Sequence, residues 1–213
     1  MNGKRAESTA TTETAATQKR SLIIQAAIEV FAEHGYYNSR VSDIVKRVDA
    51  AQGVFYYYFR SKEEVLVTIF REAWSNLLKR IERINAKEEG TLAKLRGVAE
   101  YIFRSFRHNP ALMKVLIMDL PRLDRFYDEE NQALYNRLFE EVADLVREGQ
   151  RKGLINKDIS PMVASYIFHG AIDALIRHYL YNPNFDETQF PIEEAVDQVV
   201  QVLLNGLVKV TMT

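Results

Sequence analysis

Large apolar residues recur at helical spacing through most of the chain. From Lys19 onward they return every three or four residues, as on one face of an α-helix. No stretch alternates apolar and polar residues for long enough to predict a β-strand. We therefore predict an all-α protein of about nine helices. These are a first helix of about four turns from Lys19, a second over 40–48, an aromatic third after Ala51, and others near 62–86, 91–108, 110–119, 129–152, 160–181 and 191–211.

Glycine and proline fall where these helices are predicted to begin or end. Gly35 follows the first helix, and Gly153 follows the helix over 129–152. The five prolines lie at junctions or in first turns, where a missing N–H is tolerated: Pro110, Pro121, Pro161, Pro183 and Pro191. Residues 1–17 are polar and lack apolar periodicity, so we expect a disordered tail.

The first three predicted helices form an N-terminal unit. Two short helices joined by a tight turn, after a longer supporting helix, are typical of a helix-turn-helix DNA-binding head. We expect Asn38 or Ser39 to cap the second helix, and Asp49 to cap the third. The predicted organisation is a tail over 1–17, a helix-turn-helix head over 18–64, and a larger helical body over 65–213 that binds ligand and dimerises.

Charge is unevenly distributed along the chain. The formal net charge is -1. Up to Lys62, however, nine basic residues outnumber six acidic ones, so the remainder carries about four net negative charges. A basic head on an acidic body indicates a protein that contacts DNA with one end.

The aromatic third helix carries side chains suited to DNA. Gln52 can read a base edge, tyrosine hydroxyls can bond phosphate oxygens, and Arg60 and Lys62 can neutralise phosphate charge. An alternative stays open for Gln52, since Asp49 precedes it at the spacing of a capping box. Phe55 and Phe59 are expected to fill the core of the head instead.

Residues from about Lys19 to Leu66 resemble the TetR family of bacterial regulators. The matching residues are Ala26-Ala27, Phe31, Gly35-Tyr36, Val41, Asp43-Ile44, Gly53-Val54-Phe55-Tyr56-Tyr57-Tyr58-Phe59 and Ser61-Lys62-Glu63-Glu64-Val65-Leu66. The family usually has glycine at Asp49, serine or threonine at Ala51, and alanine at Val45 and Val48. These departures leave the fold prediction unchanged and the operator sequence open. With Lys19 added for its place at the start of the first helix, the resemblance implies this DNA-facing set: Lys19, Arg40, Ser42, Gln52, Val54, Tyr56, Tyr58 and Lys62.

Aromatic and methionine side chains are frequent on the helices of the body. Most are expected to be core, but the same residue types make adaptable walls for an apolar pocket. The resemblance implies an effector site here, for which we expect a hydrophobic small molecule. The candidate ligand-binding residues are Trp74, Phe103, Phe106, Met113, Ile117, Tyr135, Phe139, His169 and Asp173.

His169, Asp173 and Arg177 are spaced to share one helix face. They fit a salt-bridged stripe at a surface or subunit interface, or a polar anchor inside a ligand pocket. A metal site is a third reading, but His169 and His178 lack ligand spacing without a further partner, so no metal is predicted.

The last two predicted helices carry dense apolar stripes. The resemblance implies a homodimer through the helices over 160–181 and 191–211. DNA geometry agrees, because two recognition helices must reach major grooves about 34–36 Å apart.

Several classes of protein are disfavoured by what the chain lacks. It has no cysteine, no apolar run approaching the roughly 20 residues of a membrane span, and no hydrophobic signal core. We expect a cytoplasmic protein without membrane contact or cofactor. No Ser/His/Asp arrangement, paired-carboxylate cleft or metal motif indicates a catalytic site.

The predicted function is therefore that of a ligand-responsive transcriptional regulator. We expect a repressor that a hydrophobic small molecule releases from a palindromic operator. The alternative is a DNA-binding regulator whose body binds protein partners and senses no small molecule. An enzyme has the least support.

Overall fold

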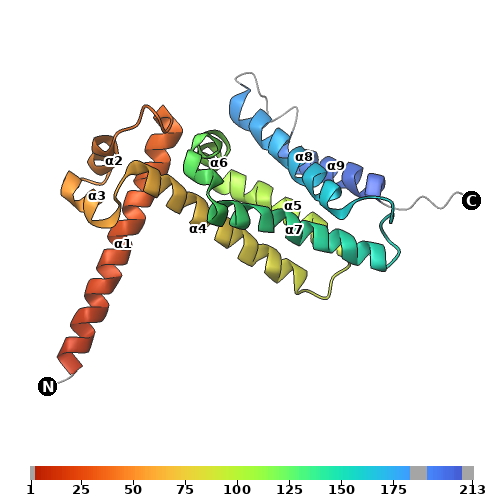
Figure 1. Cartoon of the computed structure of the whole chain (residues 1–213), viewed down its shortest axis with the longest axis horizontal. Helices are drawn as coiled ribbons and strands as arrows, with labels where there is room; N and C mark the ends of the chain where they lie inside the picture. The colour runs from red at the N-terminus through yellow and green to blue at the C-terminus, as the bar shows by residue number, and fades with distance from the viewer. Residues whose placement is uncertain (1–2, 183–190, 208–213) are drawn as a thin grey trace, which may run out of the picture. The chain divides into compact units, whose positions relative to one another are not determined.

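The computed structural model describes residues 3–182 and 191–207, and over these ranges the chain folds into helices without a strand (Figure 1). This confirms the all-α prediction. Pro183 and the predicted helical residues 208–211 lie outside the described ranges. The elements are α1 (Gly3–His34), α2 (Val41–Arg47), α3 (Gln52–Tyr58), α4 (Lys62–Asn85), α5 (Thr91–His108), α6 (Pro110–Met118), the 3-10 helices η1 (Leu120–Arg122) and η2 (Asp124–Tyr127), α7 (Glu129–Arg151), α8 (Pro161–Tyr181) and α9 (Ile192–Leu207).

Residues 3–17 were predicted to be disordered but belong to helix α1. The helix runs from Gly3 to His34 as one element. Residues 3–17 include four alanines, and alanine has the highest helix propensity of any residue. The helix thus continues backward from its apolar part over a segment that has no apolar periodicity of its own.

Contacts divide the chain into two compact units. Unit 1 comprises Met1–Phe70 and Ala111–Phe126, and unit 2 comprises Arg71–Pro110 and Tyr127–Thr213. Helix α4 therefore contributes residues 62–70 to unit 1 and the rest to unit 2. Helix α6 and the two 3-10 helices belong with the N-terminal helices, so the segment predicted as body is shared between the units.

Unit 1 is built on an aromatic and aliphatic core. Phe31 of α1, Phe55 of α3 and Phe70 of α4 are each at most 1% exposed, and Phe59 is also buried. Burying one such side chain contributes about 1.5–3 kcal/mol. The prediction that Phe55 and Phe59 are core residues is confirmed.

Unit 2 is centred on helices α5, α7 and α8. A partly buried polar cluster joins α5 to the end of α7: Lys94 Nζ lies 3.6 Å from Glu148, and Thr91 donates to the same carboxylate at 3.2 Å. Ion pairing with Lys152 and Lys94 holds the pKa of Glu148 below its usual value. Within the described ranges, no helix is long and apolar enough to cross a membrane, and no group of three His, Cys, Asp or Glu residues is placed to hold a metal.

Candidate functional site

Helix α3 presents an exposed face that contains two tyrosines. Tyr56 is 55% exposed and Tyr57 is 79% exposed, and Gln52 and Gly53 are exposed as well. Phe55 of the same helix is buried and anchors α3 in the core of unit 1. Both tyrosine rings, in contrast, lie at the surface rather than in the core.

The structure presents the tyrosines differently from the predicted set. The prediction named Tyr58 and omitted Tyr57, but Tyr58 is half-buried and packs edge-on against Tyr57 at 4.9 Å. Val54, also predicted, is half-buried on the same helix. We therefore add Tyr57 to the DNA-facing candidates.

The predicted capping box at the start of α3 is wrong. The N-cap of α3 is Ala51, which offers no side-chain hydrogen bond, and helix α3 begins at Gln52. Asp49 lies two residues earlier, in the turn, with a φ of 47°. Asp49 therefore does not cap this helix, and the exposed Gln52 is not folded back to complete a capping box.

The left-handed backbone at Asp49 suits glycine better than a residue with a Cβ. Left-handed φ is costly for residues with a branched Cβ and is free for glycine. We expect Asp49→Gly to keep or raise the free energy of unfolding, and Asp49→Val to lower it by about 1–2 kcal/mol. Urea titration measures both. A loss with glycine as large as the loss with valine would contradict the role of backbone strain.

Gly53 is not required by the fold of the head. A Cβ built on Gly53 would meet no heavy atom within 4 Å, and its φ lies outside the left-handed region. A glycine inside a helix is less stable than alanine by about 0.5–1 kcal/mol, so the fold gains nothing from it. Gly53 thus leaves open space at the exposed face of α3.

Gly53→Ala is therefore expected to separate stability from DNA binding. We expect the melting temperature to rise slightly, because alanine has the higher helix propensity. Operator affinity is expected to fall by about tenfold, because the new methyl group would keep α3 away from the DNA. Differential scanning calorimetry and fluorescence anisotropy measure the two effects. Unchanged affinity would show that Gly53 lies away from the DNA.

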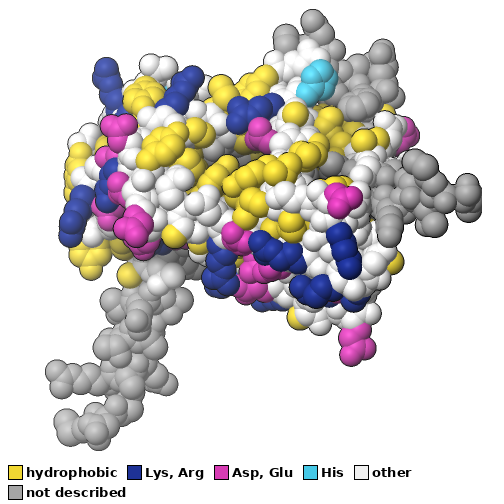
Figure 2. Space-filling view, turned by 45° about the vertical axis from the view of Figure 1, so that its right-hand side comes forward, with side chains coloured by type: hydrophobic (Ala, Val, Ile, Leu, Met, Phe, Trp, Pro, Cys, Tyr) yellow, Lys and Arg dark blue, Asp and Glu magenta, His cyan; other side chains and the backbone are white. Residues whose placement is uncertain are grey.

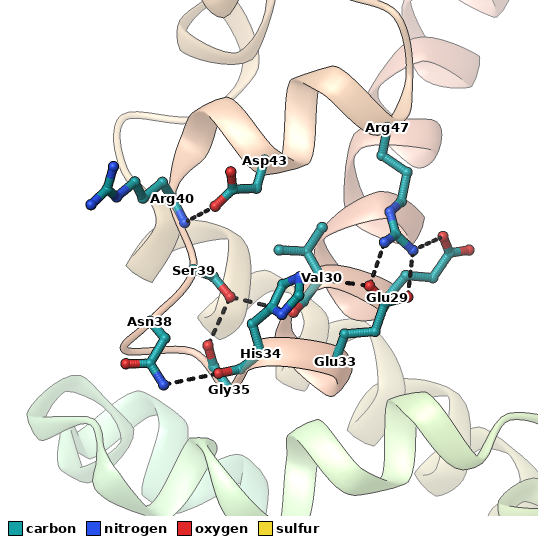
Figure 3. Close-up of polar contacts among 10 residues, drawn as sticks. All are labelled: Glu29, Val30, Glu33, His34, Gly35, Asn38, Ser39, Arg40, Asp43 and Arg47. Atoms are coloured by element: carbon teal, nitrogen blue, oxygen red, sulfur yellow. Dashed lines mark hydrogen bonds and ion pairs between the residues drawn. The ribbon is translucent and has the colours of Figure 1, made fainter.

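Polar contacts fix α2 against α1 (Figure 3). Arg47 of α2 pairs with Glu29 at 3.1 Å and with Glu33 at 2.8 Å, both on α1. The backbone N–H of Arg40 donates to Asp43 at 2.8 Å and so closes the start of α2. These contacts set the angle at which α2 and the following turn present α3.

The predicted caps of α2 have other partners. Arg40, rather than Asn38 or Ser39, is the N-cap residue. The hydroxyl of Ser39 lies 2.7 Å from the Gly35 carbonyl, and Asn38 donates to the His34 carbonyl at 3.0 Å. Both side chains thus close the turn that follows α1.

Three further residues of the predicted DNA-facing set lie on α1 and α2 or at their ends. Arg40 is exposed and lines a shallow hollow of about 470 Å³ together with His34, Asn38 and Asp43 (Figure 3). Lys19 and Ser42 are half-buried. Of the three side chains, that of Arg40 is the most accessible to a partner.

Lys62 is placed differently from the prediction. Its ammonium donates to the carbonyls of Tyr36 at 2.7 Å and Ser39 at 3.0 Å, and it lies 4.3 Å from the centre of the Tyr36 ring. A third carbonyl, that of Tyr37, is 3.3 Å away. Burial lowers the pKa of Lys62. The ammonium is thus committed to the turn after α1, and we withdraw Lys62 as a phosphate contact.

Lys62→Met tests this revised role. The three carbonyls would lose a charged donor, so we expect the free energy of unfolding to fall by about 2 kcal/mol, with the salt dependence of operator binding unchanged. A lysine that contacts phosphate would instead reduce the slope of log affinity against log salt by about one per protomer. Arg40→Gln is the control, for which we expect a changed slope and unchanged stability.

The turn after α1 also contacts the segment after α6. The hydroxyl of Tyr37 donates to the carbonyl of Arg122 at 2.8 Å. The carboxylate of Asp119, which is 5% exposed, accepts a hydrogen bond from the backbone of Tyr36, while burial raises the pKa of Asp119. Sequence reasoning missed this connection. A single acid inside the apolar run around Leu116 and Leu120 was the available signal.

Part of the predicted ligand-binding set forms one aromatic cluster in unit 2. Trp74 of α4 stacks on Tyr135 of α7 with ring centres 5.5 Å apart, and Tyr135 meets Phe139 at 5.1 Å. Phe139 in turn meets His169 of α8 at 4.7 Å and Tyr166 at 5.0 Å. Three helices thus contribute to a continuous series of ring contacts, which we call the aromatic cluster.

The other predicted ligand-binding residues lie elsewhere. Phe103 and Phe106 are buried on α5, and Phe106 meets Tyr179 of α8 at 6.1 Å. Met113 and Ile117 belong to unit 1. A shallow hollow of about 410 Å³ on α4 has a polar lining and contains none of the predicted residues: Arg71, Glu72, Ser75, Asn76 and Lys79.

His169 and Asp173 do not form one polar stripe. Asp173 pairs with Arg177 at 2.6 Å, and both side chains are more than 40% exposed, as in a surface ion pair. The His169 side chain is instead half-buried with its Nε2 atom fully buried, and burial lowers the pKa of His169 to about 4. The surface reading fits the ion pair, while His169 belongs to the aromatic cluster.

Helix α8 also carries an exposed apolar face. Hydrophobic side chains are visible at the molecular surface among charged ones (Figure 2). On α8, Val163, Tyr166 and Ile167 are each more than 50% exposed, and the small residues Gly170 and Ala174 continue the same face. Such a face is suited to another helix pair.

Comparison with known proteins gives consistent matches over most of the chain. Residues 23–69 match the family described as "Bacterial regulatory proteins, tetR family", and residues 70–206 match "YsiA-like protein, C-terminal region". The "Fatty acid metabolism regulator protein" of Bacillus subtilis (strain 168) is 28% identical over 191 residues, which cover 87% of this chain and 93% of that protein.

Solved structures of transcriptional regulators also match most of the chain. The transcriptional regulator FadR from Bacillus subtilis in complex with stearoyl-CoA is 26% identical with a TM-score of 0.77, over 88% of this chain and 98% of that one. The ketosteroid transcriptional regulator KstR2 of Mycobacterium tuberculosis has a TM-score of 0.73 at 20% identity, over 90% of this chain and 95% of that one. The latter match supports the fold alone.

Proposed function

Because the chain belongs to the TetR family of bacterial regulatory proteins, with a YsiA-like C-terminal region, we propose that it is a homodimeric repressor released from a palindromic operator by a long-chain fatty acyl thioester. The family is one of DNA-binding transcriptional regulators rather than enzymes. The site of action would be the cytoplasm, where the operator DNA lies.

The exposed face of α3 is the observation that carries the DNA-binding part of the proposal. Gln52 would read a base edge, and Tyr56 and Tyr57 would donate hydrogen bonds to phosphates. Arg40, at the start of α2, would add a phosphate contact. Gly53 leaves room for the DNA between these side chains.

The aromatic cluster supports an effector with a long apolar part. Apolar and aromatic walls from α4, α7 and α8 suit an acyl chain, for which hydrophobic burial supplies the affinity. The similar Bacillus subtilis regulators are named for fatty acid metabolism and for a complex with stearoyl-CoA. The alternative of a body that binds only protein partners is less favoured for this reason.

The exposed face of α8 supports a homodimer. Val163, Tyr166 and Ile167 would be covered by the same face of a second copy, and Gly170 and Ala174 permit close approach of the two helices. Two copies would present two α3 helices to successive major grooves. Light scattering of the full chain would then give twice its mass of 24.6 kDa.

Helix α4 provides a covalent route from effector to DNA-binding head. Its residues 71–85 lie in unit 2 with the aromatic cluster. Its first residue, Lys62, is hydrogen-bonded to the turn after α1 in unit 1. An effector changes operator affinity only if it binds the two conformations of the dimer unequally. A coupling of about 1–3 kcal/mol is typical and suffices for regulation.

Titration of stearoyl-CoA into a complex of the full chain with labelled operator DNA tests the proposed function. Fluorescence anisotropy is expected to fall as the DNA is released, with coenzyme A alone as the control that lacks the acyl chain. Complex that stays intact at saturating stearoyl-CoA would overturn the effector assignment.

A further inference from the structure

His169, a member of the aromatic cluster, has a buried ring nitrogen without a hydrogen-bond partner among the described residues. His169 packs edge-on against Phe139 at 4.7 Å and Phe168 at 5.5 Å. Its Nε2 atom is buried, and no group in the described part of the chain forms a hydrogen bond with it. Burying an unpaired polar atom destabilises a fold. Packing alone therefore does not explain a histidine at this position.

The other ring nitrogen defines what Nε2 can bind. The backbone carbonyl of Leu138 accepts a hydrogen bond from His169, and since Nε2 has no partner, this bond comes from Nδ1. Burial lowers the pKa of His169 to about 4, so the ring is neutral near pH 7. A neutral imidazole with its proton on Nδ1 carries a lone pair on Nε2. That atom accepts a hydrogen bond and cannot donate one.

The surroundings make this acceptor selective. Phe139 and Phe168 flank the ring, and Tyr135 and Trp74 extend the same cluster. An apolar environment strengthens a hydrogen bond and penalises a charged group that enters it. A neutral N–H or O–H donor is therefore favoured at Nε2, whereas a carboxylate would face the lone pair without gaining a hydrogen bond.

We propose that His169 Nε2 is the recognition point for a neutral hydrogen-bond donor on an otherwise apolar effector. This rests on the proposed function, because it places the effector in the aromatic cluster. A fatty acyl thioester of coenzyme A meets the requirement through the amide N–H groups of its pantetheine arm. A free fatty acid, ionised near pH 7, has no such donor and is discriminated against.

Two substitutions separate the functions of the two ring nitrogens. In His169→Asn, the side-chain amide can still donate to the Leu138 carbonyl from near the Nδ1 position, but nothing replaces the acceptor at Nε2. In His169→Gln, the longer side chain places an amide oxygen near the Nε2 position. The pair therefore removes or keeps the acceptor while both variants retain a neutral polar side chain.

Two matched probes differ in the donor and in two N-methyl groups. Decanamide and N,N-dimethyldecanamide share the chain and the carbonyl, but only the first has N–H groups. Trp74 is the only tryptophan of the chain and lies in the cluster, so quenching of its fluorescence reports binding of either probe to the full-length protein. Testing both probes on each variant cancels the difference in probe size, as in a double-mutant cycle.

We expect the wild-type protein to bind decanamide about tenfold more tightly than the dimethyl probe, as one net hydrogen bond provides. His169→Asn is expected to abolish this preference and His169→Gln to keep most of it. An equal preference in wild type and His169→Asn would overturn the proposal. So would a wild-type protein that prefers neither probe or binds neither.

The experiments distinguish failure of the proposed role of His169 Nε2 from failure of the proposed function. If stearoyl-CoA releases the operator while the probe preference is absent or independent of His169, the effector assignment stands and the role of Nε2 falls. If the probe preference depends on His169 but stearoyl-CoA has no effect on the operator complex, the donor site stands and the effector is another apolar molecule with a neutral donor.

Discussion

Replacing Tyr56 and Tyr57 together by alanine is expected to lower operator affinity by about three orders of magnitude. Each hydroxyl that bonds a phosphate is worth at least about 1 kcal/mol, and a dimer carries each substitution twice, so the loss reaches about 4 kcal/mol. Thermal stability should hold, because the two rings are 55% and 79% exposed. Anisotropy with labelled operator, at fixed salt, measures the affinity.

Tyr127→Ala is the matched control for this double variant. Tyr127 is an exposed tyrosine at 60% and lies outside α1–α3. We expect its loss to leave operator affinity unchanged. A double variant that binds as tightly as the wild type would show that α3 does not meet DNA through this face.

Phe55→Ala, one position earlier, is expected to lower the free energy of unfolding instead. Phe55 is 0% exposed and packs against Phe59 at 5.8 Å, so truncation removes buried area and leaves a cavity. Phenylalanine to alanine changes in a core cost about 3–5 kcal/mol. Urea unfolding followed by circular dichroism should show this loss.

Phe55→Leu controls for volume. A leucine fills much of the same space, so we expect a loss of under about 1.5 kcal/mol with operator binding retained. A free energy of unfolding for Phe55→Ala within about 1 kcal/mol of the wild-type value would contradict a tightly packed head. Adjacent residues thus separate the anchor of α3 from its contact face.

Helix positions followed from the sequence with small errors. The predicted 91–108 matches α5 (Thr91–His108), and the predicted 62–86 nearly matches α4 (Lys62–Asn85). Both have strong 3.6-residue periodicity, and each is bounded on one side by residues that interrupt it. Gly90 directly precedes α5, and a charged run follows Asn85 at the end of α4. The DNA-facing position of Tyr56 was implied by the family resemblance, and Phe55 was expected in the core of the head; the structure shows the first exposed and the second buried.

The roles of individual polar side chains were harder to predict. Lys62 looked like a phosphate contact because it is a cation close after the aromatic helix, but its partners are carbonyls more than 20 residues away in sequence. Asp49 looked like a cap because of its spacing to Gln52, whereas its φ of 47° places it in the turn. Such roles depend on tertiary neighbours and backbone angles, which neither periodicity nor spacing encodes.

His169 shows that spacing also fails to predict how deeply a polar side chain is buried. Its spacing to Asp173 and Arg177 indicated one polar face, but the ion pair lies at the surface and the imidazole faces Phe139. Helical spacing places residues on a face without stating how deep that face is buried. Only packing against α7 distinguishes the enclosed histidine from the exposed pair.

Selection from a pool of random DNA duplexes tests the central claim most directly. The full-length wild-type protein is predicted to enrich sequences with two inverted half-sites about one helical turn apart, since two α3 helices read successive major grooves. The Tyr56→Ala/Tyr57→Ala protein, carried through the same rounds, should enrich nothing. Failure of the wild type to enrich a symmetric sequence, or equal enrichment by the double variant, would contradict an operator-binding dimer that reads DNA through α3.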